Sequence, residues 1–291
     1  MKITFRHILL VLLPTVVLGF CNSIKKDSRS ILVDDVLQIL KSNHYKPLEV
    51  DDTLSDRVYN LFLDQLDERK IFFTEKDIEG FEKYRYQLDD EIKKKSFVWF
   101  DNVTEIYQKR VKEAATYSNK GLEQKFAFDL EETIDLPDES RKASEDGKKL
   151  CQYWGKYIHF LVLDNYARKL ILQEDASKNG DTAYKQQPVD TLLKKAISET
   201  DKNQKEWFKR LIRLEEKDYF NMYINAIASA FDPHTGYFPP REKEDFDIKL
   251  SGQFEGIGAS LSERDGYIKV ENIIPGSASY RQGELKAGDL I

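Results

Sequence analysis

The residues best suited to chemistry lie near the end of the sequence, at Gly256-Ile257-Gly258-Ala259. Glycines allow consecutive backbone N–H groups to converge on one point, where they can bind an anion such as a peptide's terminal carboxylate. The strand expected after this bend could pair with the same peptide, and Ile257, Ala259 and Leu261 would offer it an apolar pocket. The alternative is a glycine bulge that serves packing alone, and the spacing by itself leaves both interpretations open.

Other patterns that carry chemistry are weak in this sequence. The glycine bend is no dinucleotide fingerprint, because the third glycine is missing and no helix is expected after it. The sequence has no Gly-x-Ser-x-Gly elbow, and paired acids in a chain with 51 acidic residues are interpreted as solvated faces. We therefore assign no catalytic residue within these 291 residues.

The histidines do not suggest a metal site. None of them shows His-x-x-x-His or Cys-x-x-Cys spacing, so the sequence predicts neither zinc nor any other cofactor. His234 lies in a proline-rich segment and is interpreted as a hydrogen-bonding loop anchor, not as a catalytic base. The four histidines are His7, His44, His159 and His234.

Composition narrows the class of protein. Hydrophobic residues make up 41% and charged residues 33% of the chain, which is typical of a surface-rich helical protein and not of a membrane-embedded one. The formal net charge of −6 and the lack of a basic stripe with interleaved aromatics argue against a nucleic-acid partner.

Residues 1–21 are predicted to be a signal peptide. Lys2 and Arg6 precede an apolar run of secretory length that is too short for a comfortable membrane span. Cys21 closes the run and resembles the lipidated cysteine of a bacterial lipoprotein, although Phe20 departs from the small residue expected before it. A lipid anchor at Cys21 in the periplasm or cell envelope is the favoured interpretation. A plain secretory signal and an uncleaved anchor remain open.

The expected state of the second cysteine, Cys151, depends on whether Cys21 is lipidated. If Cys21 is acylated, Cys151 is a lone thiol on a helix, and we expect it to be buried filler. A Cys21–Cys151 disulfide in an oxidising compartment is the alternative, although two cysteines make no disulfide framework.

The mature chain is predicted to be mainly α-helical and to end in an incomplete β-rich unit. The predicted segments are a tether over 22–30, a helical domain over 31–230, a proline-rich connector over 231–249 and the β-rich unit over 250–291. No sequence repeat is evident, so a solenoid is not expected.

Three helices in the helical domain have clear signals. Apolar residues at helical spacing predict a helix from about Asp52. Thr74 and Asp77 form a capping-box pattern that opens one helix continuing to Ile92. A long helix is expected from about Asp201 to Ala230. The stripe of the first helix consists of Leu54, Val58, Leu61, Phe62, Gln65 and Leu66.

The β-rich unit is expected to contain a hairpin and a short helix. Arg264-Asp265-Gly266 is a hairpin turn signal, and Tyr267 to Ile274 read as the returning strand. Ser277 is a plausible N-cap for the short helix. A further strand begins near Gly288, so we expect the sequence to be the N-terminal part of a longer protein.

Three groups of residues resemble one family. Asp232-Pro233-His234-Thr235-Gly236-Tyr237-Phe238 is similar to the linker of the bacterial tail-specific proteases, the carboxy-terminal processing peptidases of the Ser/Lys dyad type. Phe254 to Ala259 resembles the start of their PDZ domain, and Pro275 to Ala278 with Gly288 to Ile291 resembles its later landmarks. Asn43-His44-Tyr45-Lys46 and Leu63 to Asp67 are similar to their helical N-terminal domain.

The resemblance implies an exported serine endopeptidase whose PDZ domain takes up the unstructured C-terminal tails of substrates. Its catalytic Ser and Lys belong to a domain after the PDZ unit, so no residue here inherits either role and this fragment is expected to be inactive. The resemblance favours carboxylate binding by Gly256 to Ala259, and a lipoprotein adaptor is a further expected partner. A non-enzymatic envelope adaptor that binds peptide C-termini is the alternative, and a purely structural helical envelope protein is a third interpretation.

Overall fold

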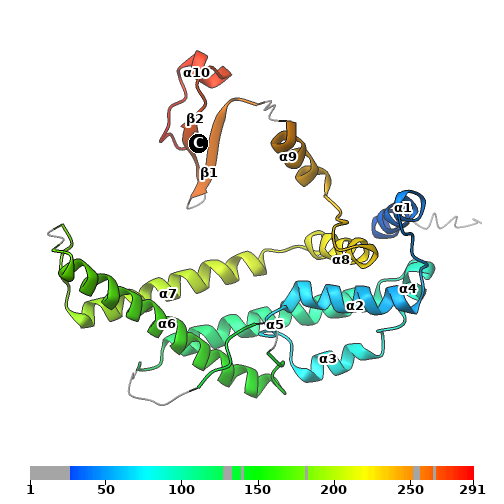
Figure 1. The fold of residues 1–291 in the computed structure, drawn as a ribbon, viewed down its shortest axis with the longest axis horizontal. Coiled ribbons are helices and arrows are strands. Elements are labelled where there is room, and N and C mark those ends of the chain that lie inside the picture. The colour runs from blue at the N-terminus through cyan, green and yellow to red at the C-terminus, as the bar shows by residue number, and fades with distance from the viewer. Residues whose placement is uncertain (1–26, 127–132, 139–140, 181–182, 252–255, 265–266) are drawn as a thin grey trace, which may run out of the picture.

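The computed structural model describes residues 27–126, 133–138, 141–180, 183–251, 256–264 and 267–291 (Figure 1). This part of the chain is mainly α-helical with a small antiparallel sheet, which confirms the predicted fold class. The helices are α1 (Ser28–Asn43), α2 (Asp52–Asp67), α3 (Glu75–Glu82), α4 (Leu88–Lys94), α5 (Val98–Leu122), α6 (Gly147–Lys178), α7 (Val189–Ile212), α8 (Glu216–Phe231), α9 (Pro240–Ser251) and α10 (Ala278–Gln282). The strands are β1 (Ala259–Arg264) and β2 (Tyr267–Ile273).

The helical body is built around α2, α5 and α8. Helix α2 packs against α8, while α5 packs against the long pair α6 and α7, and α1 lies on α8 (Figure 1). The helix predicted from Asp52 is confirmed as α2, and the carboxylate of Asp51 caps it by accepting the N–H of Leu54 at 3.0 Å. Its buried face includes most of the predicted stripe, whereas Gln65 is exposed.

Aromatic side chains fill the centre of the body. The ring of Phe62 on α2 lies 5.5 Å from both Trp99 on α5 and Tyr223 on α8, in edge-to-face geometry. These three side chains are almost completely buried. Burying an aromatic side chain of this size is worth roughly 1.5–3 kcal/mol, so this cluster is a main source of cohesion between α2, α5 and α8.

The prediction of a single helix from Thr74 to Ile92 is wrong, because the helix is interrupted between the end of α3 at Glu82 and the start of α4 at Leu88. The capping box at Thr74 and Asp77 is present and opens α3 as predicted. The first turn of α4, however, is fixed by α2: the Ser55 hydroxyl accepts the N–H of Asp89 at 2.8 Å and donates to its carboxylate at 2.9 Å. This long-range contact starts a new helix, whose only local sequence signal is the acidic first turn at Asp89 to Glu91.

The helix predicted over Asp201 to Ala230 is also wrong in its limits. The structure continues α7 through Asp201 to Ile212 and starts α8 at Glu216. A second capping box causes the new start, because the Asp218 carboxylate accepts the N–H of Glu215 at 2.8 Å and the Glu215 side chain caps in return. Glutamate is an unusual N-cap, so apolar periodicity hid this boundary.

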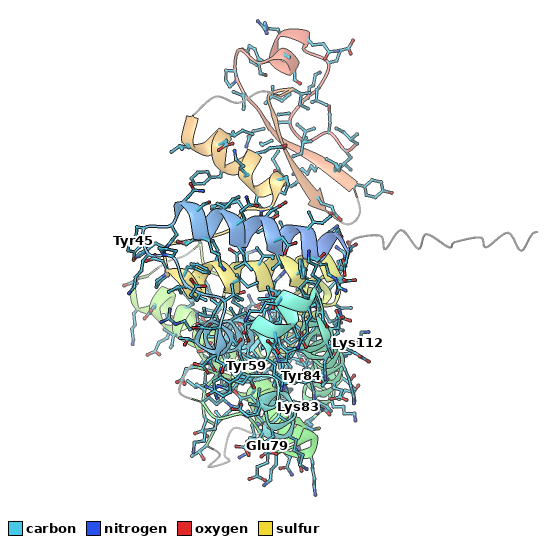
Figure 2. The ribbon with its side chains drawn as sticks, turned by 90° about the vertical axis from the view of Figure 1, so that its right-hand side faces the viewer. Tyr45, Tyr59, Glu79, Lys83, Tyr84 and Lys112 are labelled. Carbon is cyan, nitrogen blue, oxygen red and sulfur yellow. The ribbon has the colours of Figure 1, made fainter. Side chains whose placement is uncertain are left out.

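The β-rich unit confirms the predicted hairpin. Strands β1 and β2 pair antiparallel with a bulge between Ser260 and Leu261, and residues 288–291 pair along the other side of β2. Ser277 caps α10 as predicted, since its hydroxyl accepts the N–H of Tyr280 at 3.2 Å. Figure 2 shows the hairpin and α10 on the far side of α1 and α8 from α3.

Two predictions concern the N-terminal segment. The signal peptide over 1–21 and the lipidation of Cys21 lie outside the described residues. Helix α1 begins at Ser28, so the last three residues of the predicted tether are helical. Among the helices that the structure describes, none combines the length and the hydropathy that a membrane crossing requires.

Candidate functional site

The glycine bend depends on close contact with the start of α10. Gly258 is buried and has φ of +77°, in the left-handed region that glycine adopts without steric cost. A Cβ atom at this position would lie 1.9 Å from Cβ and 2.4 Å from Oγ of Ser277. Both the backbone angle and the contact with Ser277 therefore require glycine at position 258.

Hydrogen bonds fix the carbonyl groups of the bend. Ser279 N–H donates to the Ile257 carbonyl at 3.0 Å, and Ile274 N–H donates to the Gly258 carbonyl at 2.8 Å. In a planar trans peptide, the carbonyl and the N–H of the following residue point in opposite directions. The bonds to Ile257 and Gly258 therefore turn the N–H groups of Gly258 and Ala259 away from α10 and β2.

The residues of the bend differ in exposure: Gly258 is buried against Ser277, Ile257 is exposed and Ala259 is partly buried. Within the described residues, no acceptor lies against the N–H of Ile257 or of Gly258. The bond from Ile274 N–H to the Gly258 carbonyl makes Ala259 and Ile273 a non-hydrogen-bonded pair. The Ala259 N–H therefore faces the outer edge of β1, along which no described strand lies.

The side chains predicted to form the apolar pocket lie beside this bend. Ile257 is 52% exposed and Leu261 is 46% exposed, so both are accessible to a peptide side chain. Leu261 follows Ala259 on β1 but lies beyond the bulge, and Gly256 is exposed at the start of the bend. The structure thus gathers the predicted binding residues at one end of β1.

The proline-rich connector is held against the end of α8. The Asn225 side-chain amide pairs with both backbone groups of Tyr237: its Oδ1 accepts the Tyr237 N–H at 2.8 Å, and its Nδ2 donates to the Tyr237 carbonyl at 3.0 Å. Asn225 was not among the candidate residues predicted from the sequence. Its position inside a helix, where asparagine is unfavourable, was the available signal.

Asp232 makes a second contact between the connector and the helical body. Its carboxylate accepts the N–H of His234 at 2.7 Å and the hydroxyl of Tyr45 at 2.9 Å, and Tyr45 follows the end of α1 (Figure 2). These two donors, led by the His234 N–H, hold the pKa of Asp232 below its usual value. His234 thus anchors the loop through its backbone N–H.

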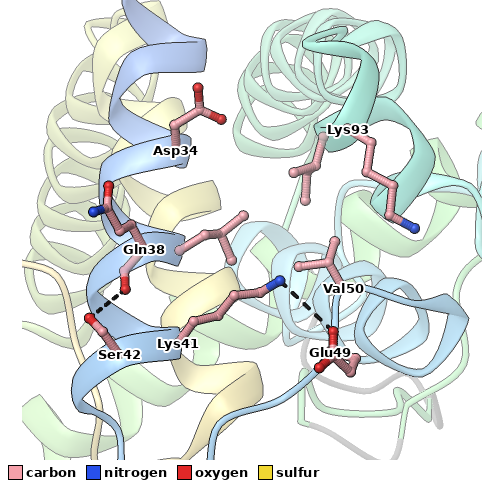
Figure 3. A pocket seen from close by; sticks show the side chains of 9 residues that line it. Asp34, Gln38, Lys41, Ser42, Glu49, Val50 and Lys93 are labelled. Carbon is pink, nitrogen blue, oxygen red and sulfur yellow. Dashed lines mark hydrogen bonds and ion pairs between the residues drawn. The ribbon is translucent and has the colours of Figure 1, made fainter.

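A groove lies between α1 and α4 in the helical body (Figure 3). Leu37, Val50 and Ile92 contribute its apolar lining, and Lys41 pairs with Glu49 across it at 3.9 Å. The other charged lining residues are also in ion pairs: Lys93 with Asp89 at 2.7 Å and Asp34 with Lys95 at 2.8 Å. These internal pairs give the groove no charge that calls for a particular ligand.

Two further groups bear on possible chemistry. Asp67 is buried as the last residue of α2 and accepts the N–H groups of Ile71, Phe72 and Phe73 at 2.8–2.9 Å, so it stabilises the turn that follows the helix. Cys151 is partly accessible, so the expectation of a buried side chain is wrong, and its thiol forms no disulfide with any described residue; Cys21, the alternative partner, lies outside them. In the described part of the chain, no cluster of three or more His, Cys, Asp or Glu could hold a metal ion.

Comparison with known proteins identifies the family. Residues 36–241 match the tail specific protease N-terminal domain, so the chain belongs to this family. The tail-specific protease of Haemophilus influenzae is 25% identical over 258 residues, which cover 87% of this chain and 33% of that protein. The carboxy-terminal processing protease CtpA of Bacillus subtilis is 39% identical over 65 residues, covering 22% of this chain and 14% of that protein. The chain thus spans about a third of the first relative's length.

Proposed function

We propose that this chain is the N-terminal part of an exported serine endopeptidase that degrades or processes proteins from their C-terminal tails. In this proposal the 291 residues supply substrate recognition. The relatives named as proteases support a protease as the parent protein. The observation that carries the recognition role is the set of N–H groups at the glycine bend, beside the uncovered edge of β1.

The chemistry of the bend suits a peptide carboxylate. The N–H groups of Ile257, Gly258 and Ala259 would donate charge-assisted hydrogen bonds to its oxygens, and such bonds are stronger than those between neutral groups. The peptide would then continue as an added strand along the edge of β1. Ile257 and Leu261, both half-exposed, would contact its apolar side chains.

The remaining parts of the proposal concern the whole protein. Cleavage would be performed by a domain beyond Ile291, with Ser as nucleophile and Lys as base, so the 291-residue chain alone would be inactive. Export through residues 1–21 and lipidation at Cys21 would place the protein in the periplasm or cell envelope. Its partners would be unstructured C-terminal tails of proteins and a lipoprotein adaptor, with no cofactor.

Peptide binding to the full-length protein tests the recognition role. A peptide with a free C-terminal carboxylate should bind at least about tenfold more tightly than its C-terminally amidated form, because only the carboxylate accepts charge-assisted bonds. Equal affinity for the two peptides would contradict carboxylate recognition.

A matched pair of glycine variants tests whether the preference for the carboxylate depends on the glycine bend. Gly258→Ala should abolish it, since the added Cβ would lie 1.9 Å from Ser277 Cβ and force the bend to move. Gly276→Ala is the control, because Gly276 also has positive φ, +82°, but has open space around it. If the control loses the preference to the same extent, backbone strain explains the effect and the site assignment is wrong.

Activity assays test whether recognition and cleavage reside in different parts of the protein. The 291-residue chain should leave a substrate with an unstructured tail intact under conditions in which the full-length protein cleaves it. Cleavage by the shorter chain would refute the proposal that the catalytic residues lie beyond Ile291.

A further inference from the structure

Ser277 joins the glycine bend and α10 through one side chain. Its hydroxyl donates to the Gly258 carbonyl at 3.2 Å and accepts the N–H of Tyr280 at 3.2 Å. Its Cβ also packs directly against Gly258, at the place where a side chain on residue 258 would project. One serine therefore caps α10 and supports the glycine bend at the same time.

We propose that Ser277 is a positioning residue that sets the direction of the carboxylate-binding N–H groups, an inference that rests on the proposed function. The Gly258 carbonyl has two donors, the N–H of Ile274 and the hydroxyl of Ser277. Together they hold the peptide plane between Gly258 and Ala259, and this plane fixes where the Ala259 N–H points. Without the hydroxyl, one donor remains and the plane can rotate.

The chemistry of serine suits this double task. A hydroxyl group donates one hydrogen bond and accepts others, so it can serve the Gly258 carbonyl and the Tyr280 N–H together. Its short side chain is also compatible with the close approach of Gly258, where the ideal Cβ position lies 3.3 Å from Ser277 Cα. A positioning role therefore predicts that the hydroxyl matters beyond its contribution as a helix cap.

Two substitutions separate positioning from capping. Ser277→Ala removes the hydroxyl and is a poor N-cap, whereas Ser277→Gly removes the hydroxyl but is a cap only a few tenths of a kcal/mol weaker than serine. If Ser277 positions the bend, both variants of the full-length protein should bind a free-carboxylate peptide roughly fivefold to tenfold more weakly. Ser277→Thr, which retains the hydroxyl, should restore most of the affinity.

The amidated peptide provides the readout that a merely structural role would not change. Loss of positioning should lower the ratio of carboxylate to amide affinity, with the amide affinity nearly constant. If Ser277 only caps α10, Ser277→Gly should bind like the wild type. If it only supports folding, affinities for both peptides should fall together with the thermal midpoint.

The outcomes also distinguish this inference from the function on which it rests. If the wild-type protein does not prefer the carboxylate, the proposed function fails and Ser277 has nothing to position. If the wild type has the preference and both hydroxyl-free variants retain it in full, the proposed function stands and the role of Ser277 is refuted.

Discussion

Asn225 offers the sharpest test of how the connector is held. Asn225→Ala removes both hydrogen bonds to the Tyr237 backbone, at 2.8 and 3.0 Å, and leaves the remainder of α8 intact. A hydrogen bond of this kind contributes about 0.5–1.5 kcal/mol net, so losing the pair should destabilise this attachment by about 1–3 kcal/mol. Since 1.4 kcal/mol is a tenfold change, the Tyr237 amide should exchange its hydrogen roughly tenfold to a hundredfold faster.

Asn225→Asp is the matched control for this measurement. The carboxylate can still accept the Tyr237 N–H but cannot donate to the Tyr237 carbonyl, so exchange should be accelerated less than in Asn225→Ala. Hydrogen exchange followed by mass spectrometry or NMR gives the rates, with the buried amides of α2 as an internal reference. Unchanged protection of Tyr237 in Asn225→Ala would refute the reasoning and leave the contacts of Asp232 as the effective attachment.

Three further predictions concern the stability of the helical body. Burial, opposed by three N–H donors, raises the pKa of Asp67 to about 6, above the ~3.9 of an unfolded chain. The folded state therefore binds this proton more tightly, and roughly 3 kcal/mol of stability, present below about pH 4, should be lost as the pH rises to 6. Denaturant unfolding at several pH values should show this fall of the unfolding free energy in the wild type and not in Asp67→Asn. An NMR titration midpoint of Asp67 below pH 4 would contradict it, because stability would then rise with pH. Gly121→Val should lower the unfolding free energy by about 1–3 kcal/mol, because a Cβ at position 121 would lie 3.0 Å from the Cβ of Ile158 on α6. An unchanged melting temperature would contradict the tight packing of α5 on α6 at this position. Trp154→Phe should destabilise by about 1–3 kcal/mol, since the Ile71 carbonyl loses its buried donor at 2.9 Å, and calorimetry would measure the loss.

The features that the sequence predicted well are those whose causes are local. The capping box at Thr74, the cap of α10 at Ser277 and the hairpin of β1 and β2 each depend on residues close together in the chain. The glycine bend is only partly of this kind: glycine permits the positive φ at position 258, but Ser277 and Ile274 hold the bend from farther along the chain. Sequence patterns could therefore point to Gly256 to Ala259 as a bend, while carboxylate binding there stays a prediction.

The features that the sequence missed have causes distant in the chain. Ser55 bonds to the first turn of α4 across 34 residues, and the acids Asp89 to Glu91 are the one local sign that a helix begins there. The contact of Tyr45 with Asp232 joins residues 187 positions apart. Apolar periodicity could not place these boundaries, because it reports which face of a helix is buried and not which polar partner ends or starts it.

The connector has two parts that are held by different contacts, residues 232–237 and the segment from Phe238 onward. Residues 232–237 are attached to the helical body through Asp232 and Asn225, so they move with α8. The next contact is the stacking of Phe238 on Phe246 of α9, with ring centroids 5.2 Å apart. The start of α9 is therefore positioned after Tyr237 by this aromatic pair and the prolines between its members, because φ is fixed at each proline. A change at Asn225 should loosen the attachment of Tyr237 to α8 and leave the internal geometry of the glycine bend unchanged, since Ser277, Ser279 and Ile274 hold the bend within its own unit.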